Sequence, residues 1–294
     1  MRVLATRRFV GPAWDELEDV AIGSLDAARD DVEALVVANE RVDQTVLERF
    51  PHLRLVANFG VGYDRIDVDA CRHRGVAVTN TPGVLTDATA DLTFALILAA
   101  RRRLGEGERI VRSRRWTWTW SRGLLADEVT GSTLGIVGLG RIGAAVARRA
   151  QGFDMRVLSL RSAGTDDQLD DLLRASDIAT LHVPLTPRTR GMIDARRLAL
   201  LRDGACLINT ARGELIDEEA LVRELVSGRI QAGLDVFADE PHVPEELLRL
   251  DNVVLTPHLG SATVRAREAM TRLVVDNVLA VLRGEPPLTP VRPP

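Results

Sequence analysis

A glycine-rich motif, Gly138-Leu139-Gly140-Arg141-Ile142-Gly143, constrains the fold of this chain more than any other feature of its sequence. It follows the apolar run from Leu134 to Val137 and precedes the helical pattern from Ala144 to Ala150. Between a strand and a helix, the first glycine permits a tight turn, the second lets the backbone approach a pyrophosphate, and the third lets the helix pack on the strand. The amides and dipole of the helix start also favour phosphates. We therefore predict a dinucleotide site that uses Gly138, Gly140, Arg141, Ile142 and Gly143.

Short β-rich runs alternate with stretches of helical length on both sides of this motif. Four such runs occupy residues 2–6, 32–38, 53–58 and 76–80. Six more occupy residues 133–138, 155–160, 178–183, 205–209, 231–236 and 253–256. The alternation predicts an α/β protein with two doubly wound parallel-sheet domains, a Rossmann cofactor domain and a flavodoxin-like substrate domain, and a cleft between them.

Two long helical patterns mark where the chain passes between these domains. One starts near Leu92 and runs into Arg101, and the other covers about Thr263 to Leu282, before a proline-rich tail. We expect the tail to return to the first domain. The substrate domain would then be discontinuous, with residues 1–98 and 278–294, and residues 99–277 would form the NAD(P)-binding domain.

Charge and hydropathy exclude several classes of protein. The net charge of -4 offers no basic field for nucleic acid or for an anionic membrane as the main partner. The longest nearly apolar run, Leu92 to Ala100, is far shorter than the roughly 20 residues of a membrane span, and no signal peptide is apparent. We expect a cytoplasmic protein.

Lysine and cysteine usage narrows the possible chemistry. All 38 basic residues are arginine, which excludes Schiff-base chemistry and a phosphate-binding lysine. Cys71 and Cys206 have no second thiol nearby in the sequence, so we expect no disulfide framework, no metal site and two buried thiols. Any anion must be bound by arginine or by backbone amides.

The end of the second strand of the cofactor domain bears on the choice of cofactor. An NAD-selective site places an acid there to bind the ribose 2′-hydroxyl. Here Arg161 stands 18 residues after Gly143 and is followed by Ser162. A guanidinium and a hydroxyl suit a 2′-phosphate, so we predict that NADP(H) is preferred and that NAD(H) is possible. The alternative is that Arg161 is a solvated loop residue with no effect on cofactor choice.

Three segments with chemically active residues lie at the carboxyl ends of predicted strands, where open parallel sheets bind ligands. They are Asn209–Gly213, Gly233–Pro241 and Thr256–Ser261. Hydride transfer to a 2-oxo acid requires a cation for the carboxylate, a proton donor for the carbonyl oxygen and an acid that keeps the donor protonated. We assign these catalytic roles to Arg212, His258 and Glu240, with Arg212 and His258 also binding substrate.

Other residues of the cofactor domain receive less direct assignments. Asp235 is better placed for the nicotinamide carboxamide than for proton transfer. Val183 and Pro184 are interpreted as an apolar wall for adenine. His182 competes with His258 for the role of proton donor, but a packed strand residue is the favoured interpretation. Taken singly, any of these residues, like Arg212 or His258, could be structural.

Together these residues resemble the D-isomer-specific 2-hydroxyacid dehydrogenases, especially their glyoxylate/hydroxypyruvate reductase branch. The resemblance covers nearly the whole chain. Besides the segments above, it includes Asn58–Asp64, Ile66-Asp67, Val78–Gly83, Ser176-Asp177 and Pro184–Thr186.

The resemblance implies further roles. The amides of Val61 and Gly62 would bind the substrate carboxylate with Arg212, Thr210 and Ala211 would lie beside the nicotinamide, and Gly260 would follow the catalytic histidine in the cofactor site. It also implies a homodimer formed largely through the cofactor domain. Three tryptophans would lie near that interface, in the partner's active site or in simple packing: Trp116, Trp118 and Trp120.

Three functions stay open at this point. The first is reduction of glyoxylate or hydroxypyruvate with NADPH. The second is reduction of a larger 2-oxo acid. The third is a nucleotide-sensing scaffold, similar to transcriptional corepressors that share the fold, although no long disordered tail or basic patch supports it.

Overall fold

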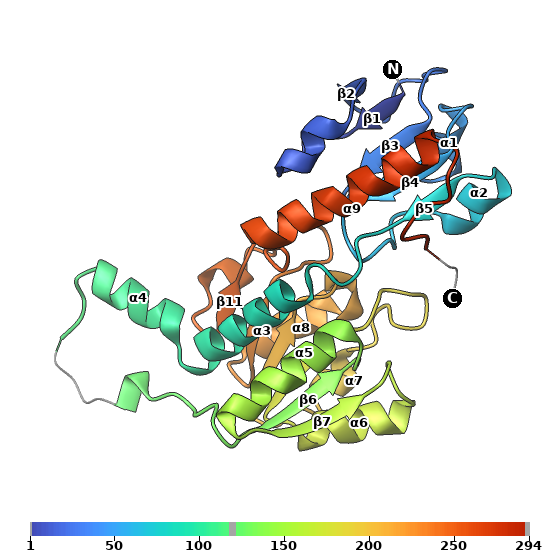
Figure 1. Cartoon of the computed structure of the whole chain (residues 1–294). Coiled ribbons are helices and arrows are strands. Elements are labelled where there is room, and N and C mark those ends of the chain that lie inside the picture. The colour runs from blue at the N-terminus through green and yellow to red at the C-terminus, as the bar shows by residue number, and fades with distance from the viewer. Residues whose placement is uncertain (1, 118–121, 292–294) are drawn as a thin grey trace. The chain divides into compact units, whose positions relative to one another are not determined.

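The computed structural model describes residues 2–117 and 122–291 and divides into two compact units (Figure 1). Unit 1 comprises Met1–Leu85 and Ser261–Pro294, and unit 2 comprises Thr86–Gly260. These boundaries differ from those predicted at 98/99 and 277/278. The reason is that α3 (Thr86–Arg101) packs along its length on strands of unit 2, whereas α9 (Val264–Leu282) packs on strands of unit 1. The predicted boundaries cut through both helices near their ends.

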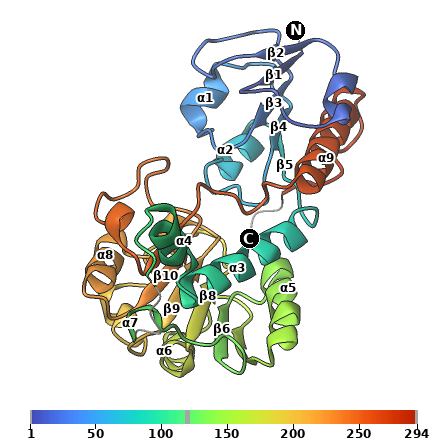
Figure 2. The same ribbon diagram turned by 90° about the vertical axis from the view of Figure 1, so that its left-hand side faces the viewer.

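Unit 1 contains a five-stranded parallel sheet in the order β2-β1-β3-β4-β5. This is the flavodoxin-like order. Its α-helices α1 and α2 lie on one face, and α9 with the 3-10 helix η1 lies on the other (Figure 2). Strand β2 was not predicted, since it is a three-residue edge strand with no fully buried side chain. The elements are β1 Val3–Ala5, η1 Pro12–Glu16, β2 Val20–Ile22, β3 Ala34–Val37, α1 Gln44–Glu48, β4 Leu55–Asn58, α2 Val68–His73, β5 Ala77–Thr79 and α9.

Unit 2 contains a six-stranded parallel sheet in the order β11-β10-β9-β8-β6-β7. Its strands fall within the six predicted runs. The strands are β6 Thr133–Val137, β7 Arg156–Leu160, β8 Ile178–Leu181, β9 Cys206–Asn209, β10 Gln231–Leu234 and β11 Val253–Leu255. The helices besides α3 are α4 Leu104–Arg112, η2 Arg122–Leu124, α5 Arg141–Ala150, η3 Gln151–Phe153, α6 Asp166–Ala175, α7 Ala195–Leu198, η4 Gly213–Leu215, α8 Glu218–Val226 and η5 Leu247–Arg249.

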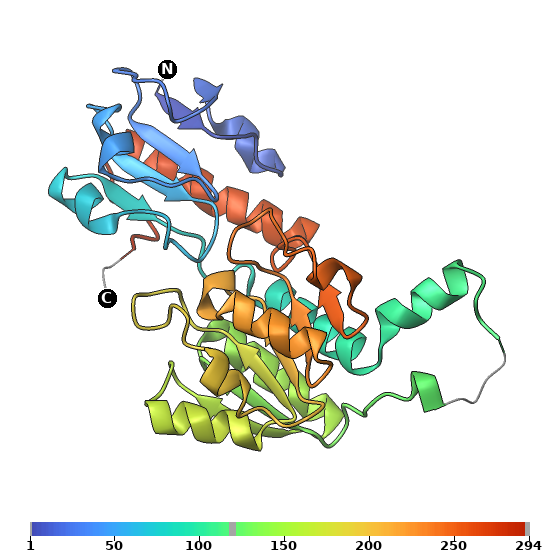
Figure 3. The ribbon, with the colours of Figure 1, turned by 180° about the vertical axis from the view of Figure 1, so that it is seen from behind.

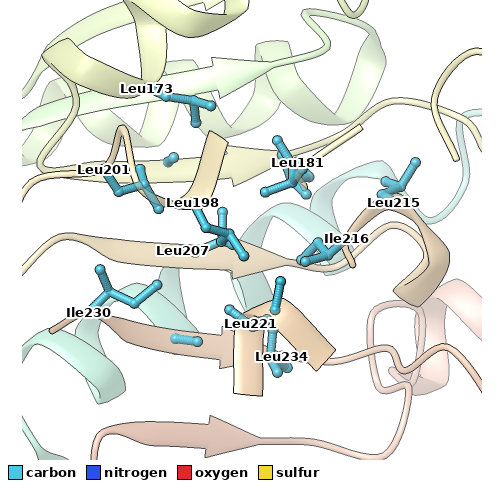
Figure 4. Close-up of a cluster of buried hydrophobic side chains, with 14 of the residues drawn as sticks. Leu173, Leu181, Leu198, Leu201, Leu207, Leu215, Ile216, Leu221, Ile230 and Leu234 are labelled. Carbon is cyan, nitrogen blue, oxygen red and sulfur yellow. The ribbon is translucent and has the colours of Figure 1, made fainter. Parts of the chain in front are cut away.

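Both faces of the unit 2 sheet are covered by helices, because successive strand residues point to opposite faces. Ile136 and Ile208 belong to a buried cluster with α3 and α5. Leu181 and Leu207 belong to the cluster on the other face, with leucines of α6, α7 and α8 (Figure 4). Burial on both faces explains the continuous apolar runs in the sequence.

The order of the strands reverses at β6, which pairs with β7 on one side and β8 on the other. Open α/β sheets bind ligands beyond the carboxyl ends of the strands at such a switch point. The glycine motif directly follows β6, so it lies at the position where this topology predicts a ligand.

Helix α4 and the described residues after it, 113–117 and 122–125, stand away from the sheet of unit 2 (Figures 1 and 3). The helix has no buried residue, and several apolar side chains of this arm are exposed, namely Leu104, Val111, Trp116, Leu124 and Leu125. Trp118 and Trp120 lie outside the described residues. Within the part of the chain that the structure describes, no helix is long and apolar enough to span a membrane.

Candidate active site

Two of the three glycines in the motif are required by close backbone contacts. Gly138 has a φ of 101°, and a Cβ there would lie 2.6 Å from the carbonyl oxygen of His182. At Gly143 a Cβ would lie 2.1 Å from the carbonyl oxygen of Gly138. Gly140 has open space around its Cβ position and is the N-cap of α5, and being a glycine it offers no side-chain hydrogen bond to the amides of the first turn. These amides fit the phosphates of a dinucleotide.

The glycine turn is hydrogen-bonded to the end of β7, because Gly138 and Leu139 both donate from their amides to the carbonyl oxygen of Leu160. Arg161 and Ser162 follow immediately and are exposed. Tertiary structure therefore brings the two parts of the predicted dinucleotide site together, although Arg161 lies 18 positions after Gly143 in the sequence.

The loop after Arg161 is contacted by a second arginine, which was not predicted from the sequence. Arg188, from the loop after β8, donates from Nη2 to the carbonyl oxygen of Gly164 at 2.6 Å. The first acids after Arg161 in the sequence are Asp166 and Asp167, both exposed, and Asp166 forms an ion pair with Arg197 at 2.6 Å. This end of β7 thus combines two arginines with an acid that already has a cationic partner.

The competing histidine, His182, is a poor proton donor. Burial lowers its pKa to about 4, and its Nε2 lies 3.0 Å from Oγ1 of Thr180. At neutral pH the ring is therefore uncharged. Its neighbour Val183 is 3% exposed, and Pro184 is exposed.

The loop that carries Arg212 is shaped by two residues that the sequence analysis did not assign. Asn209 accepts from the amide of Ala211 at 3.0 Å and donates from Nδ2 to the carbonyl oxygen of Arg212 at 2.7 Å. A Cβ on Gly213 would lie 1.9 Å from the carbonyl carbon of Phe237. This glycine therefore lets the Arg212 loop pack directly on the backbone before Glu240.

Glu240 and His258 form the predicted pair. Oε2 of Glu240 lies 2.8 Å from Nδ1 of His258, and Oε1 accepts from the amide of Phe237 at 3.2 Å. Burial acts to raise the pKa of Glu240, but the hydrogen bond and charge of His258, the Phe237 amide and the charge of Arg212 together hold that pKa below its ordinary value. Glu240 thus interacts electrostatically with both of the other predicted catalytic residues, His258 and Arg212.

Asp235 organises the histidine loop. Its carboxylate accepts from Oγ1 of Thr256, from the amide of Leu259 and from the amide of Gly260, at 2.6, 2.6 and 2.8 Å. His258 itself has a φ of 54° and donates from its amide to the backbone carbonyl oxygen of Asp235. Burial raises the pKa of Asp235 despite these hydrogen bonds. Asp235 is 0% exposed, and its contact with a nicotinamide carboxamide stays a prediction.

Two threonines of α3 also contact the strand-end loops and were missed from the sequence. Oγ1 of Thr89 donates to the carbonyl oxygen of Gly260, and Oγ1 of Thr93 lies 3.1 Å from Oγ1 of Thr210. Their four-residue spacing within an apolar helix was the available signal, because it places both hydroxyls on one face.

The loop with Val61 and Gly62 belongs to unit 1, whereas the residues above belong to unit 2. Asn58 donates to the carbonyl oxygens of Gly60 and Gly62, and Asn80 donates to that of Val61. In a trans peptide the N–H points opposite to the preceding carbonyl. The amides of Val61 and Gly62 therefore point away from the two asparagines that hold the loop.

The chain is similar to proteins of known activity. The family described as D-isomer specific 2-hydroxyacid dehydrogenase, NAD binding domain, matches residues 94–260. A glyoxylate reductase from Pyrococcus horikoshii is 48% identical, covering 96% of this chain and 89% of that protein. A crystal structure of an NADPH-dependent glyoxylate/hydroxypyruvate reductase from Sinorhizobium meliloti, in complex with NADP and malonate, is 37% identical, covers 99% of this chain and 96% of that chain, and gives a TM-score of 0.89. A crystal structure of a protein from Thermus thermophilus is 42% identical, covers 99% of this chain and 100% of that one, and gives a TM-score of 0.91.

Proposed function

The chain belongs to the D-isomer-specific 2-hydroxyacid dehydrogenase family, and from this membership we propose that it reduces a small 2-oxo acid to the D-2-hydroxy acid with NAD(P)H. The observation that carries the proposal is the hydrogen bond between Glu240 and His258 in the same unit as the glycine motif and Arg212. A proton donor, its charged partner and a carboxylate-binding cation are the groups that this reduction requires.

Each of the three residues has one task in this reaction. The hydrogen bond from Nδ1 to Glu240 leaves Nε2 of His258 to give a proton to the carbonyl oxygen during reduction and to take it back during oxidation. Glu240 carries a negative charge that stabilises the protonated ring and sets its orientation. Arg212 binds the substrate carboxylate with its planar guanidinium and polarises the adjacent carbonyl.

The residues present fit a nicotinamide dinucleotide. Gly138 and Gly143 permit the tight turn, and the N-cap of α5 is Gly140, which has no side chain to bond the first-turn amides. When bound, the dinucleotide supplies the hydride that the carbonyl carbon accepts. We propose the same role for Gly140, Arg141 and Ile142 at the phosphates, and for Thr210, Ala211 and Gly260 near the nicotinamide.

We propose a preference for NADP(H). Arg161 and Ser162 are exposed at the end of β7, Arg188 contacts the same loop, and Asp166 is paired with Arg197. Cations beside an acid that is already paired favour a 2′-phosphate over a 2′-hydroxyl. The Sinorhizobium meliloti relative, described as NADPH-dependent, supports this choice.

For the substrate we propose glyoxylate or hydroxypyruvate, since relatives at 48% and 37% identity carry these activities in their names. We also propose that the amides of Val61 and Gly62 bind the substrate carboxylate. The exposed apolar side chains of the α4 arm support a homodimer formed through unit 2.

Initial rates of NADPH and NADH oxidation with glyoxylate, hydroxypyruvate, pyruvate and phenylpyruvate test the proposal. We expect the fastest turnover with NADPH and the first two acids. Turnover of phenylpyruvate alone would favour the reductase for a larger 2-oxo acid. Tight binding of the dinucleotide without turnover of any acid would favour the nucleotide-sensing scaffold.

A further inference from the structure

A carboxylate that the proposed mechanism does not use holds the loop of Glu240. Oε1 of Glu218 accepts a hydrogen bond from the backbone amide of Ala238 at 3.0 Å. Ala238 stands two residues before Glu240, and the preceding amide, that of Phe237, donates to Oε1 of Glu240 at 3.2 Å. Two successive backbone amides of this loop are therefore bound by two different carboxylates.

Glu218 is not required to begin its own helix. The N-cap of α8 is Asp217, whose side chain accepts from the amide of Ala220 at 3.0 Å. Glu218 comes next and is partly buried, whereas its neighbour Glu219 is exposed. The side chain of Glu218 thus serves the loop after β10 and not the start of α8.

A short segment connects Glu218 to the arginine proposed for the substrate carboxylate. Arg212 precedes Glu218 by six residues, with η4 between them. In this segment a Cβ on Gly213 would lie 1.9 Å from the carbonyl carbon of Phe237. That carbonyl belongs to the peptide bond whose N–H donates to Glu218. The segment therefore fixes one peptide of the Glu240 loop at two points.

Glu218 acts on Glu240 through position and not through charge. The charges that act on the pKa of Glu240 are those of His258 and Arg212, and Glu218 is not among them. The carboxylate of Asp235 also interacts with the charge of His258. A change at Glu218 leaves these groups in place, so it should reach the pair through the backbone of the loop.

We propose that Glu218 is a positioning residue of the active site, which keeps Glu240 within hydrogen-bond distance of Nδ1 of His258. It does so by binding the amide of Ala238. This inference rests on the proposed function, since it affects turnover only if His258 exchanges a proton with the substrate. Misplacement by about 1 Å at a reacting group can lower a rate by up to about 100-fold.

Variants of Glu218 separate the reach of the side chain from its charge. Glu218→Gln keeps an acceptor oxygen without the charge, Glu218→Asp keeps the charge on a shorter side chain, and Glu218→Ala removes both. Glu219→Ala is the matched control, because it removes an exposed acid from the same turn of α8. If Glu218→Ala does not fold, Glu218→Asp takes its place.

Rates of reduction as a function of pH give the first readout. Glu218→Ala and Glu218→Asp should lower kcat/KM for the 2-oxo acid about tenfold and move the decline of the rate to lower pH, as in Glu240→Gln. Glu218→Gln should recover most of the activity, and Glu219→Ala should stay within about twofold of the wild type. Added to Glu240→Gln, Glu218→Ala should cost less than about another twofold, because the carboxylate that it positions is already gone.

Titration of the His258 ring by NMR gives a readout that does not require turnover. Its signals are identified among those of the five histidines by their absence in His258→Gln. The midpoint should move to lower pH in Glu218→Ala and Glu218→Asp, because the protonated ring loses part of its carboxylate partner. It should keep its wild-type value in Glu218→Gln and Glu219→Ala.

The outcomes distinguish this inference from the proposed function. An unchanged midpoint and pH profile in Glu218→Ala, or in its substitute Glu218→Asp, would overturn the role of Glu218 and leave the dehydrogenase assignment intact. A fully additive loss in the double variant would also overturn it, since Glu218 would then act elsewhere than on Glu240. If the wild type reduces no 2-oxo acid, the proposed function fails, while a shifted midpoint still supports the placing of Glu240 by Glu218.

Discussion

Nδ1 of His258 lies 2.8 Å from Oε2 of Glu240, so Nε2 is the ring nitrogen that we propose for proton exchange with the substrate. Glu240 is the partner that makes this assignment possible, because its pKa lies below the ordinary value and it stays ionised at neutral pH. The side chains of His258 and Glu240 are 36% and 22% exposed, so their attraction is only partly screened by solvent. The pair therefore gives a direct prediction about pH.

Replacing Glu240 by glutamine should keep the shape of the site and remove its charge. The protonated imidazole then loses its carboxylate partner, so kcat/KM for reduction should fall at least about tenfold near neutral pH. The pH at which the reductive rate declines should also move to lower values. Steady-state rates between pH 5 and 9 measure both effects, and an unaltered pH profile would rule out the proposed pairing.

Replacing Arg212 by alanine should reduce kcat/KM for the 2-oxo acid at least about 100-fold, because a charge-assisted bidentate contact is lost. Arg212→Lys keeps the charge without the planar fork and should recover only part of the activity. Binding of the dinucleotide should persist in both variants. Wild-type kcat/KM in Arg212→Ala would refute the role in substrate binding.

Replacing Arg161 by aspartate should shift the ratio of kcat/KM for NADPH over NADH toward NADH by about tenfold or more, since a carboxylate repels the 2′-phosphate and binds the 2′-hydroxyl. Arg156→Asp is the matched control, because Arg156 is an exposed arginine at the amino end of the same strand. Equal ratios in the Arg161 and Arg156 variants would show that Arg161 is only a solvated loop residue.

Replacing Gly213 by alanine should disturb the Arg212 loop, because the new Cβ would lie 1.9 Å from the carbonyl carbon of Phe237. We expect a loss of about 2 kcal/mol or more in the free energy of unfolding, together with lower activity. Gly152→Ala serves as the control, since a Cβ at Gly152 has no heavy atom within 4 Å. Denaturant titration measures the difference, and equal stability of the two variants would contradict the contact.

Replacing His182 by asparagine should reduce the decrease in the free energy of unfolding that occurs as the pH falls. Burial lowers the pKa of His182 from 6.5 to about 4 in the folded protein, so the unfolded chain binds more protons between these values. Stability from this group is therefore fully present above pH 6.5 and is lost as the pH falls toward 4. Between pH 7 and pH 5, the free energy of unfolding should therefore fall by about 2 kcal/mol less in the variant than in the wild type.

The exposed His52→Asn variant controls for the loss of one histidine in that measurement. Denaturant titrations at the two pH values give the comparison for both variants. If His182→Asn and His52→Asn show the same dependence on pH, the buried state of His182 is not responsible for it.

Local pattern was sufficient to predict much of this protein. The alternation of apolar runs and helical stretches predicted the strands of both sheets apart from β2. Buried strands and amphipathic helices each require apolar residues at a characteristic spacing, which can be seen in the sequence. The glycine motif was equally readable, because Gly138 and Gly143 meet backbone atoms that exclude any side chain. The pairing of Glu240 with His258 followed from the chemistry of a strand-end histidine and a nearby acid.

Tertiary structure decided which buried polar groups meet. Thr93 and Thr210 are 117 positions apart, and Asp235 turns its carboxylate into the loop of Thr256 and Gly260. Periodicity could not reveal these contacts, because the hydrogen-bond partner of a buried group depends on how distant elements pack together. For the same reason the unit boundaries fall at the start of α3 and just before α9, where packing onto one sheet gives way to packing onto the other.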